Sequence, residues 1–223
     1  KRGRELDARE PGLFDASVAQ GSGSDSALMA YTSGTTGFPK GSLLTHTNML
    51  SMAANLIAVD PKRPGDEFLS FLPLPWIGEQ MMGVASALLV GFTVNFPEEP
   101  DTVQENLREI GPSVMFSPPR VWENLAASVQ VRVMDASPLK RFAFNRAMPI
   151  GVRMADCRFE KKPPSLGLRL AYQLAYWGVF RALRDRLGFS RLRSASTGGA
   201  ALGPDTFRFF HALGVNLKQI YGQ

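Results

Sequence analysis

The stretch Tyr31-Thr32-Ser33-Gly34-Thr35-Thr36-Gly37-Phe38-Pro39-Lys40-Gly41 carries the clearest chemical signal in this chain. It follows a short apolar run at residues 27–30, which predicts a buried strand, and it leads into residues 42–48, where a helix is expected to begin. Glycines let the backbone approach a ligand, N–H groups and hydroxyls can donate to phosphate oxygens, and a lysine neutralises charge. The stretch therefore predicts a phosphate-binding loop.

The Walker loop, G-x-x-x-x-G-K-[ST], is the first comparison, and the stretch departs from it on both sides of Lys40. Pro39 has no N–H to donate, and Gly41 stands where a magnesium-binding hydroxyl would follow the lysine. A Walker-type kinase or ATPase is therefore disfavoured. The other alternative is a surface loop without a ligand, and the specific order of hydroxyls, glycines and lysine argues against it.

Residues 31–41 resemble the phosphate-binding signature of the adenylate-forming enzymes, which include acyl-CoA synthetases, luciferases and peptide-synthetase adenylation domains. In that family the loop holds the β- and γ-phosphates of ATP. Lys40 would then be the catalytic cation. The resemblance implies ATP contacts for Thr32, Ser33, Gly34, Thr35, Thr36, Gly37 and Lys40.

Two later stretches resemble nucleotide-binding signatures of the same family. Residues 196–200 are similar to a turn of small residues that lies against adenine, and residues 220–223 are similar to the start of a signature whose tyrosine stacks on adenine. The family's phosphate- and magnesium-binding Thr and Glu would follow Gln223, so no metal ligand is expected in this chain. The resemblance implies ATP or AMP contacts for Gly198, Gly199, Ala200, Tyr221, Gly222 and Gln223.

Residues 71–80 resemble the segment in which the family usually carries a histidine beside the carboxylate substrate, and Trp76 occupies that position here. Tryptophan cannot act as a base, but its ring can form a pocket wall and its N–H can donate. The resemblance implies that Trp76, Glu79 and Gln80 border an acyl pocket. Residues 117–123 and a helical insertion at about 137–190 resemble the long-chain and very-long-chain acyl-CoA synthetase branch.

The alternation of strand and helix patterns up to residue 134 predicts an α/β fold with a mainly parallel sheet flanked by helices. Ligands are expected at the carboxyl ends of its strands. Residues 137–190 break the alternation and predict two long helices, at about 138–156 and 166–187. These form either a helical hairpin packed on the domain or a basic amphipathic surface, and the second alternative predicts peripheral membrane contact through 166–187.

Composition narrows the class of partner. The chain carries 25 Lys and Arg against 20 Asp and Glu, and this basic excess fits ATP, CoA or an anionic membrane surface. No dense basic stripe with interleaved aromatics is present, so no nucleic acid partner is expected. Cys157 is the single cysteine, which excludes an intramolecular disulfide and favours a cytoplasmic location. No apolar run reaches the roughly 20 residues that span a bilayer.

These features predict that residues 1–223 form part of an AMP-binding (adenylation) domain, an internal piece of a longer protein whose C-terminal domain follows Gln223. The resemblance implies ATP, Mg²⁺ and CoA as cofactors, and a long-chain fatty acid activated to an acyl-adenylate and then to acyl-CoA. Two alternatives stay open: a ligase that passes the acyl group to a carrier protein, and a non-catalytic nucleotide-binding relative, which Trp76 suggests. Residues 1–223 alone are not expected to catalyse the reaction.

Overall fold

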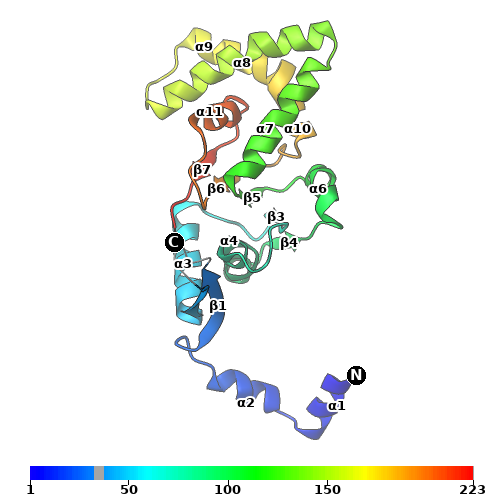
Figure 1. Cartoon of the computed structure of the whole chain (residues 1–223), viewed down its shortest axis with the longest axis vertical. Coiled ribbons are helices and arrows are strands. Elements are labelled where there is room, and N and C mark those ends of the chain that lie inside the picture. The colour runs from blue at the N-terminus through cyan, green and yellow to red at the C-terminus, as the bar shows by residue number, and fades with distance from the viewer. Residues whose placement is uncertain (33–37, 223) are drawn as a thin grey trace. The chain divides into compact units, whose positions relative to one another are not determined.

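The computed structural model describes residues 1–32 and 38–222 (Figure 1). The predicted site residues Ser33, Gly34, Thr35, Thr36, Gly37 and Gln223 therefore lie outside the described residues. The chain divides into two compact units, Lys1–Val59 and Asp60–Gln223, and each is described by itself.

The first unit combines three helices with a two-stranded antiparallel hairpin. Its elements are α1 (Arg2–Arg9), α2 (Leu13–Gln20), β1 (Ser26–Thr32), β2 (Lys40–Thr45) and α3 (His46–Val59). The side chain of Asn48 accepts hydrogen bonds from the backbone N–H and the hydroxyl of Thr45, both at 3.0 Å, and so stabilises the sharp change from strand to helix. The helix expected to begin within residues 42–48 is confirmed, and its first residue is His46.

Residues 42–45 belong to β2, which pairs with β1 in the register Thr32↔Lys40 to Ser26↔Thr45, and the helix follows directly after them. One expectation for the first unit is wrong. The apolar run at 27–30 is not buried, and half of Met29 is exposed to solvent. A two-stranded hairpin has two faces, and α3 contacts β1 and β2 without enclosing them.

The second unit is built on a five-stranded parallel sheet with the strand order β4-β3-β5-β6-β7. This confirms the predicted fold class, although the strand at 26–32 is in the hairpin and not in this sheet. Parallel strands place their carboxyl ends at one edge, which is where open α/β sheets bind ligands. The strands are β3 (Glu67–Leu69), β4 (Thr93–Asn95), β5 (Val114–Ser117), β6 (Ser194–Thr197) and β7 (Leu217–Gln219).

Helices connect the strands of this sheet. The first connection is a continuous helix over residues 77–90, and its middle widens into a π-helix. The connecting helices are α4 (Ile77–Glu79), η1 (Gln80–Ser86), α5 (Ala87–Val90), η2 (Pro100–Thr102), α6 (Val103–Ile110), α7 (Pro119–Met134) and α11 (Pro204–Ala212).

The region 137–190 contains the two long helices that the sequence predicts. The first is α8 (Pro138–Phe159). The second runs without a break through α9 (Leu166–Ala175), the π-helical η3 (Tyr176–Phe180) and α10 (Arg181–Arg186), since the junction residues keep helical dihedral angles. Among the described residues, none of the helices combines the length and the apolar character needed to cross a bilayer.

An aromatic core joins the long helices to the rest of the unit. Trp122 of α7 is fully buried, and its ring centroid lies 4.9 Å from that of Phe210 and 5.8 Å from that of Phe189. Where α8 crosses α11, Gly151 allows close approach, because a Cβ there would lie 2.8 Å from both Ala212 and the ring of Phe180. Residues 137–190 are therefore packed on the domain, as Figure 1 shows for α8 above α11.

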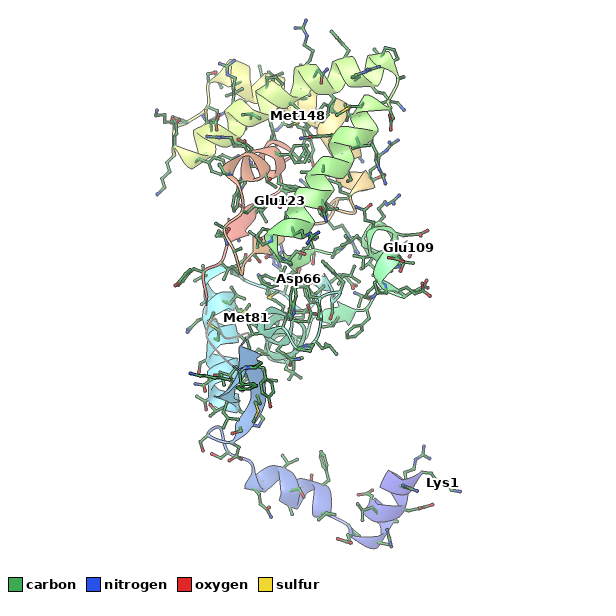
Figure 2. The ribbon with its side chains drawn as sticks, viewed as in Figure 1. Lys1, Asp66, Met81, Glu109, Glu123 and Met148 are labelled. Carbon is green, nitrogen blue, oxygen red and sulfur yellow. The ribbon has the colours of Figure 1, made fainter. Side chains whose placement is uncertain are left out.

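A buried ionic network lies beside β6 and β7. The carboxylate of Asp60 accepts from the ammonium groups of Lys62 and Lys218, both at 2.6 Å, and from the hydroxyl of Ser194. Burial and these donors act in opposite directions on the carboxyl, and the donors hold the pKa of Asp60 at about 2. Nearby, Asp66, which directly precedes β3 (Figure 2), pairs with Arg193.

Candidate functional site

The carboxyl ends of β5, β6 and β7 bring two predicted nucleotide segments together. Ser117 pairs with Thr197, and Thr197 with Gln219, so the three strands end side by side. The turn at 198–200 follows β6, and residues 220–222 follow β7. The backbone N–H of Ile220 donates to the carbonyl of Thr197 at 2.8 Å, and the side-chain amide of Gln219 donates to the carbonyl of Ala200 at 3.0 Å.

The turn after β6 leaves its backbone open. Gly199 has a φ of +87°, a conformation that favours glycine, and no atom lies within 4 Å of the place where its Cβ would be. Tyr221 is 88% exposed, and its ring is available for stacking. An uncovered glycine turn close to an exposed aromatic ring is an arrangement that suits a flat heteroaromatic ligand.

Phe116 connects this turn to the predicted acyl segment. A Cβ at Gly198 would lie 3.4 Å from the Phe116 ring, and a Cβ at Gly78 would overlap the same ring. Gly78 stands between Trp76 and Glu79, so the predicted nucleotide turn and the predicted acyl segment contact two parts of one phenyl ring. Sequence reasoning missed Phe116, and its only signal was a place near the end of a predicted strand that ends at the ligand-binding edge.

Three residues of the predicted acyl pocket have different surroundings. Trp76 is half exposed, and the side-chain amide of Gln80 donates to the carbonyl of Leu74 at 2.7 Å. Glu79 is only 1% exposed, so the structure places its carboxyl inside the unit. Neither carboxyl oxygen has a partner with hydrogen-bond geometry among the described residues.

The buried position of Glu79 favours its neutral form. Burial raises the pKa of this carboxyl, while the nearby Ser70 hydroxyl and the Leu72 backbone lower it to a lesser extent. Gly83 provides the space for the carboxyl, because a Cβ there would lie 3.1 Å from Oε1. A neutral carboxylic acid can donate one hydrogen bond, which a carboxylate cannot.

We expect Glu79→Gln to stabilise the protein at neutral pH. The folded-state pKa of Glu79 is raised above its ordinary value near 4.5, so the wild type loses stability as the pH rises from that value toward the folded pKa. Glutamine has no charged form to desolvate, so the gain should be larger at pH 7.5 than at pH 4.5, by about 1.4 kcal/mol for each unit by which folding raises the pKa of the carboxyl. Urea denaturation at pH 4.5 and 7.5 tests this, and a gain that is equal at both pH values would contradict it.

Two buried hydroxyls lie at the same edge of the sheet. Ser117 and Thr197 end β5 and β6 as paired residues, and parallel pairing directs their side chains to one face. Both are fully buried, and neither hydroxyl has a hydrogen-bond partner within the part of the chain that the structure describes. Buried polar groups without hydrogen-bond partners are rare in native proteins. The carboxyl of Glu79, close to the end of β3, is another such group at this edge.

The predicted phosphate loop belongs to the first unit. Thr32 ends β1 and Lys40 begins β2, and the two are paired across the hairpin. The antiparallel register thus brings the two ends of the loop to neighbouring positions, and this holds Lys40 at the base of the loop. The intervening Ser33–Gly37 segment lies outside the described residues.

Comparison with known proteins shows the family to which this chain belongs. Residues 2–223 match the sequence model of the AMP-binding enzyme family, and the chain belongs to that family. The adenylation domain of a carboxylate reductase from Mycobacterium chelonae superposes with a TM-score of 0.63 at 19% identity, over 91% of this chain and 27% of that one. This likeness shows a shared fold.

Among curated relatives, the chain is similar to proteins named as fatty-acid–CoA ligases. It is 34% identical over 199 residues to fadD11 of Mycobacterium tuberculosis, which is provisionally described as such a ligase, covering 89% of this chain and 35% of that protein. It is 30% identical over 204 residues to the long-chain-fatty-acid–CoA ligase ACSBG2 of Rattus norvegicus, covering 88% of this chain and 30% of that protein. The chain thus spans about a third of the length of these relatives.

Proposed function

We propose that the protein containing this chain activates a long-chain fatty acid with ATP, first to an acyl-adenylate and then to acyl-CoA. The observation that supports the proposal is the contact of Phe116 with both Gly198 and Gly78, because it joins the predicted nucleotide turn to the predicted acyl segment at the carboxyl edge of the sheet. The similarity to proteins named as fatty-acid–CoA ligases supports the choice of acid and acceptor.

The proposed chemistry has two displacement steps. A carboxylate oxygen attacks the α-phosphorus of ATP, the bond from that phosphorus to the bridging oxygen breaks, and pyrophosphate leaves. The sulfur of CoA then attacks the acyl carbonyl carbon, and AMP leaves. Such steps depend on positioning and on cations near the developing charge.

Individual residues of the chain would meet these needs. Gly198, Gly199 and Ala200 would hold the adenine between the turn and Tyr221. Lys40 and the loop at 32–37 would bind the phosphates and neutralise the charge that builds on pyrophosphate. Bound Mg²⁺ would add further charge neutralisation. Trp76 would form a wall of the acyl pocket, where its half-exposed ring can contact an aliphatic chain.

Acid-dependent exchange between ATP and labelled pyrophosphate in the full-length protein tests the first step. We expect exchange to rise with acid length from acetate to hexadecanoate, because each buried methylene adds roughly 0.8 kcal/mol. A folded protein that binds ATP but supports no exchange with any acid would instead be a non-catalytic relative. Formation of acyl-CoA from added CoA, rather than acylation of a carrier protein, tests the second step.

Peripheral membrane contact through 166–187 also has structural support. Leu166, Leu170, Leu174 and Trp177 are largely exposed at three- and four-residue steps, and they form one stripe of the helix. The guanidinium of Arg181 lies 4.9 Å from the centre of the Trp177 ring. We propose that this stripe contacts an anionic bilayer. Co-sedimentation with anionic vesicles should fall for Leu170→Ser/Leu174→Ser, and unchanged sedimentation would contradict the proposal. The cytoplasmic location stays a prediction.

A further inference from the structure

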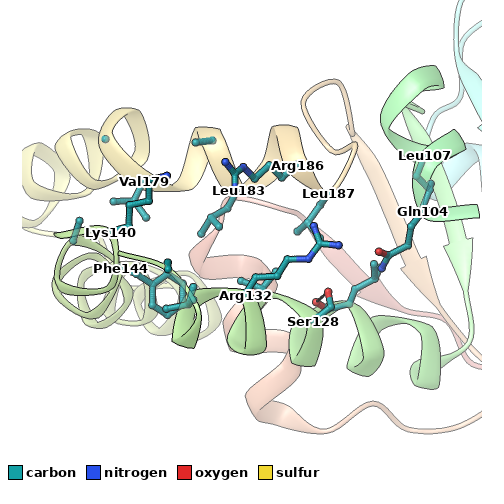
Figure 3. A pocket seen from close by; sticks show the side chains of 17 residues that line it. Gln104, Leu107, Ser128, Arg132, Lys140, Phe144, Val179, Leu183, Arg186 and Leu187 are labelled. Carbon is teal, nitrogen blue, oxygen red and sulfur yellow. Dashed lines mark hydrogen bonds between the residues drawn. The ribbon is translucent and has the colours of Figure 1, made fainter. Parts of the chain in front are cut away.

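The second unit contains a cavity of about 240 Å³ that lies within its helical layer. Figure 3 shows it between α7, α8 and the helix that continues from η3 into α10, with α6 at one end. Its lining includes Leu107, Val129, Phe144, Leu183 and Leu187, and it includes none of the predicted nucleotide or acyl residues. The cavity is therefore separate from the candidate site at the carboxyl edge of the sheet.

Three cationic side chains line this mostly apolar cavity, together with the polar residues Gln104 and Ser128. Arg132 comes from α7, Lys140 from α8 and Arg186 from α10, and Figure 3 shows Arg132 and Arg186 on facing helices. No aspartate or glutamate is among the lining residues. None of the three cations makes a hydrogen bond or ion pair with another described residue.

Some cations of the same unit have acidic partners: Arg193 pairs with Asp66, Arg208 with Asp156, and Lys162 with Glu160. Arg132, Lys140 and Arg186 have none among the described residues, and all three are exposed, so solvent screens their mutual repulsion. A carboxylate matches guanidinium groups in geometry and charge. The charge of the lining therefore selects an anion, and its apolar walls select an aliphatic or similarly apolar body.

We propose that this cavity binds an aliphatic carboxylate, with the chain among the leucine, valine and phenylalanine side chains and the carboxylate at Arg132, Lys140 and Arg186. A cavity of about 240 Å³ has room for several methylene groups. The ligand is thus a fatty acid of medium chain length. This inference rests on the cavity alone and not on the proposed function.

The dependence of binding affinity on the number of carbons in the acid gives a quantitative expectation. Each buried methylene should tighten binding about fourfold until the cavity is filled, after which further carbons should add little. Binding should therefore strengthen from butanoate to about octanoate or decanoate and then level off. The acyl pocket of the proposed ligase would instead favour long chains, so the two sites are distinguishable.

The test uses the full-length protein with its adenylation site saturated by a non-hydrolysable acyl-adenylate analogue, and titration calorimetry with decanoate. We expect one further equivalent to bind. Ala182→Trp, which fills the cavity from α10, should weaken binding at least tenfold while leaving pyrophosphate exchange unchanged. Arg132→Gln/Arg186→Gln should weaken decanoate at least tenfold but decanol less than threefold. Arg141→Gln/Arg153→Gln removes two exposed charges of α8 outside the lining. This control should change neither the binding of decanoate nor the binding of decanol.

Several outcomes would overturn the proposal. They are the absence of a further equivalent, binding that both cavity variants leave unchanged, and decanol binding as tightly as decanoate. Decyl phosphate binding more than tenfold tighter than decanoate would assign the cavity to phosphate-headed lipids. If Ala182→Trp does not fold, as judged by its thermal melt, the arginine variant decides. Failure of the exchange assay would remove only the exchange control for Ala182→Trp, because the binding of decanoate and decanol is measured directly by calorimetry.

Discussion

Replacing Asp60 with asparagine is expected to lower the free energy of unfolding by about 3–5 kcal/mol, the usual result of removing one partner of a buried ion pair. The side chain of Lys62 is only 1% exposed, and it would lose its counter-ion while the charge of Lys218 stays near enough to repel it. In a chain of this size the change corresponds to a fall in the melting temperature of about 6–20 °C. Urea denaturation and thermal melts at pH 7 provide the measurement.

The pKa shifts of this network explain why removal of one partner costs more than the pair contributes. The pKa of Asp60 is held at about 2, which corresponds to roughly 2 kcal/mol in favour of the folded state. Burial lowers the pKa of Lys62 more than Asp60 raises it, so the lysine opposes folding. The two shifts act in opposite directions, and the net contribution of the pair is smaller than the Asp60 shift alone.

The pH dependence and a matched control separate this network from a general loss of charge. Because the folded pKa of Asp60 is depressed, its contribution is present above about 3.8 and is lost as the pH falls toward 2. The difference between wild type and variant should shrink over that range. Glu160→Gln, which breaks an exposed pair with Lys162, should change the stability far less than Asp60→Asn, because solvent and salt screen an exposed pair. Equal losses for Asp60→Asn and Glu160→Gln would refute the expectation.

Local periodicity was sufficient to predict most helices. The helix at 46–59 and the two long helices after 137 depend on apolar residues at three- and four-residue steps, which the sequence displays directly. The parallel sheet followed from the alternation of strands and helices. Periodicity does not reveal which strands pair, however. The hairpin in which Thr32 pairs with Lys40 was not predicted, because β2 is short and its hydrophobic pattern is weak.

Contacts between distant parts of the chain were beyond sequence reasoning. The ion pair between Asp60 and Lys218 spans 158 residues, and it forms only because β6 and β7 are neighbours in the sheet. The contact of Phe116 with Gly78 and Gly198 likewise depends on strand order. The resemblance to a family predicted a nucleotide segment and an acyl segment, but the phenyl ring that joins them, and the burial of Glu79, appear only in three dimensions.

Removing the charge of Lys40 is expected to lower ATP–pyrophosphate exchange by about 10²–10³-fold, the typical loss when one group that stabilises transition-state charge is removed. The hairpin register holds Lys40 beside Thr32 at the base of the predicted phosphate loop, so its ammonium group would meet charge that develops on the leaving pyrophosphate. The measurement is exchange with hexadecanoate in full-length Lys40→Ala. Lys162→Ala, which removes another exposed lysine charge, should change the rate less than twofold.

Because Lys40 is exposed, its variant should keep the wild-type melting temperature. A rate within threefold of wild type would show that this lysine does not act on pyrophosphate. A large loss with an unchanged melt would place the effect in the chemistry rather than in folding.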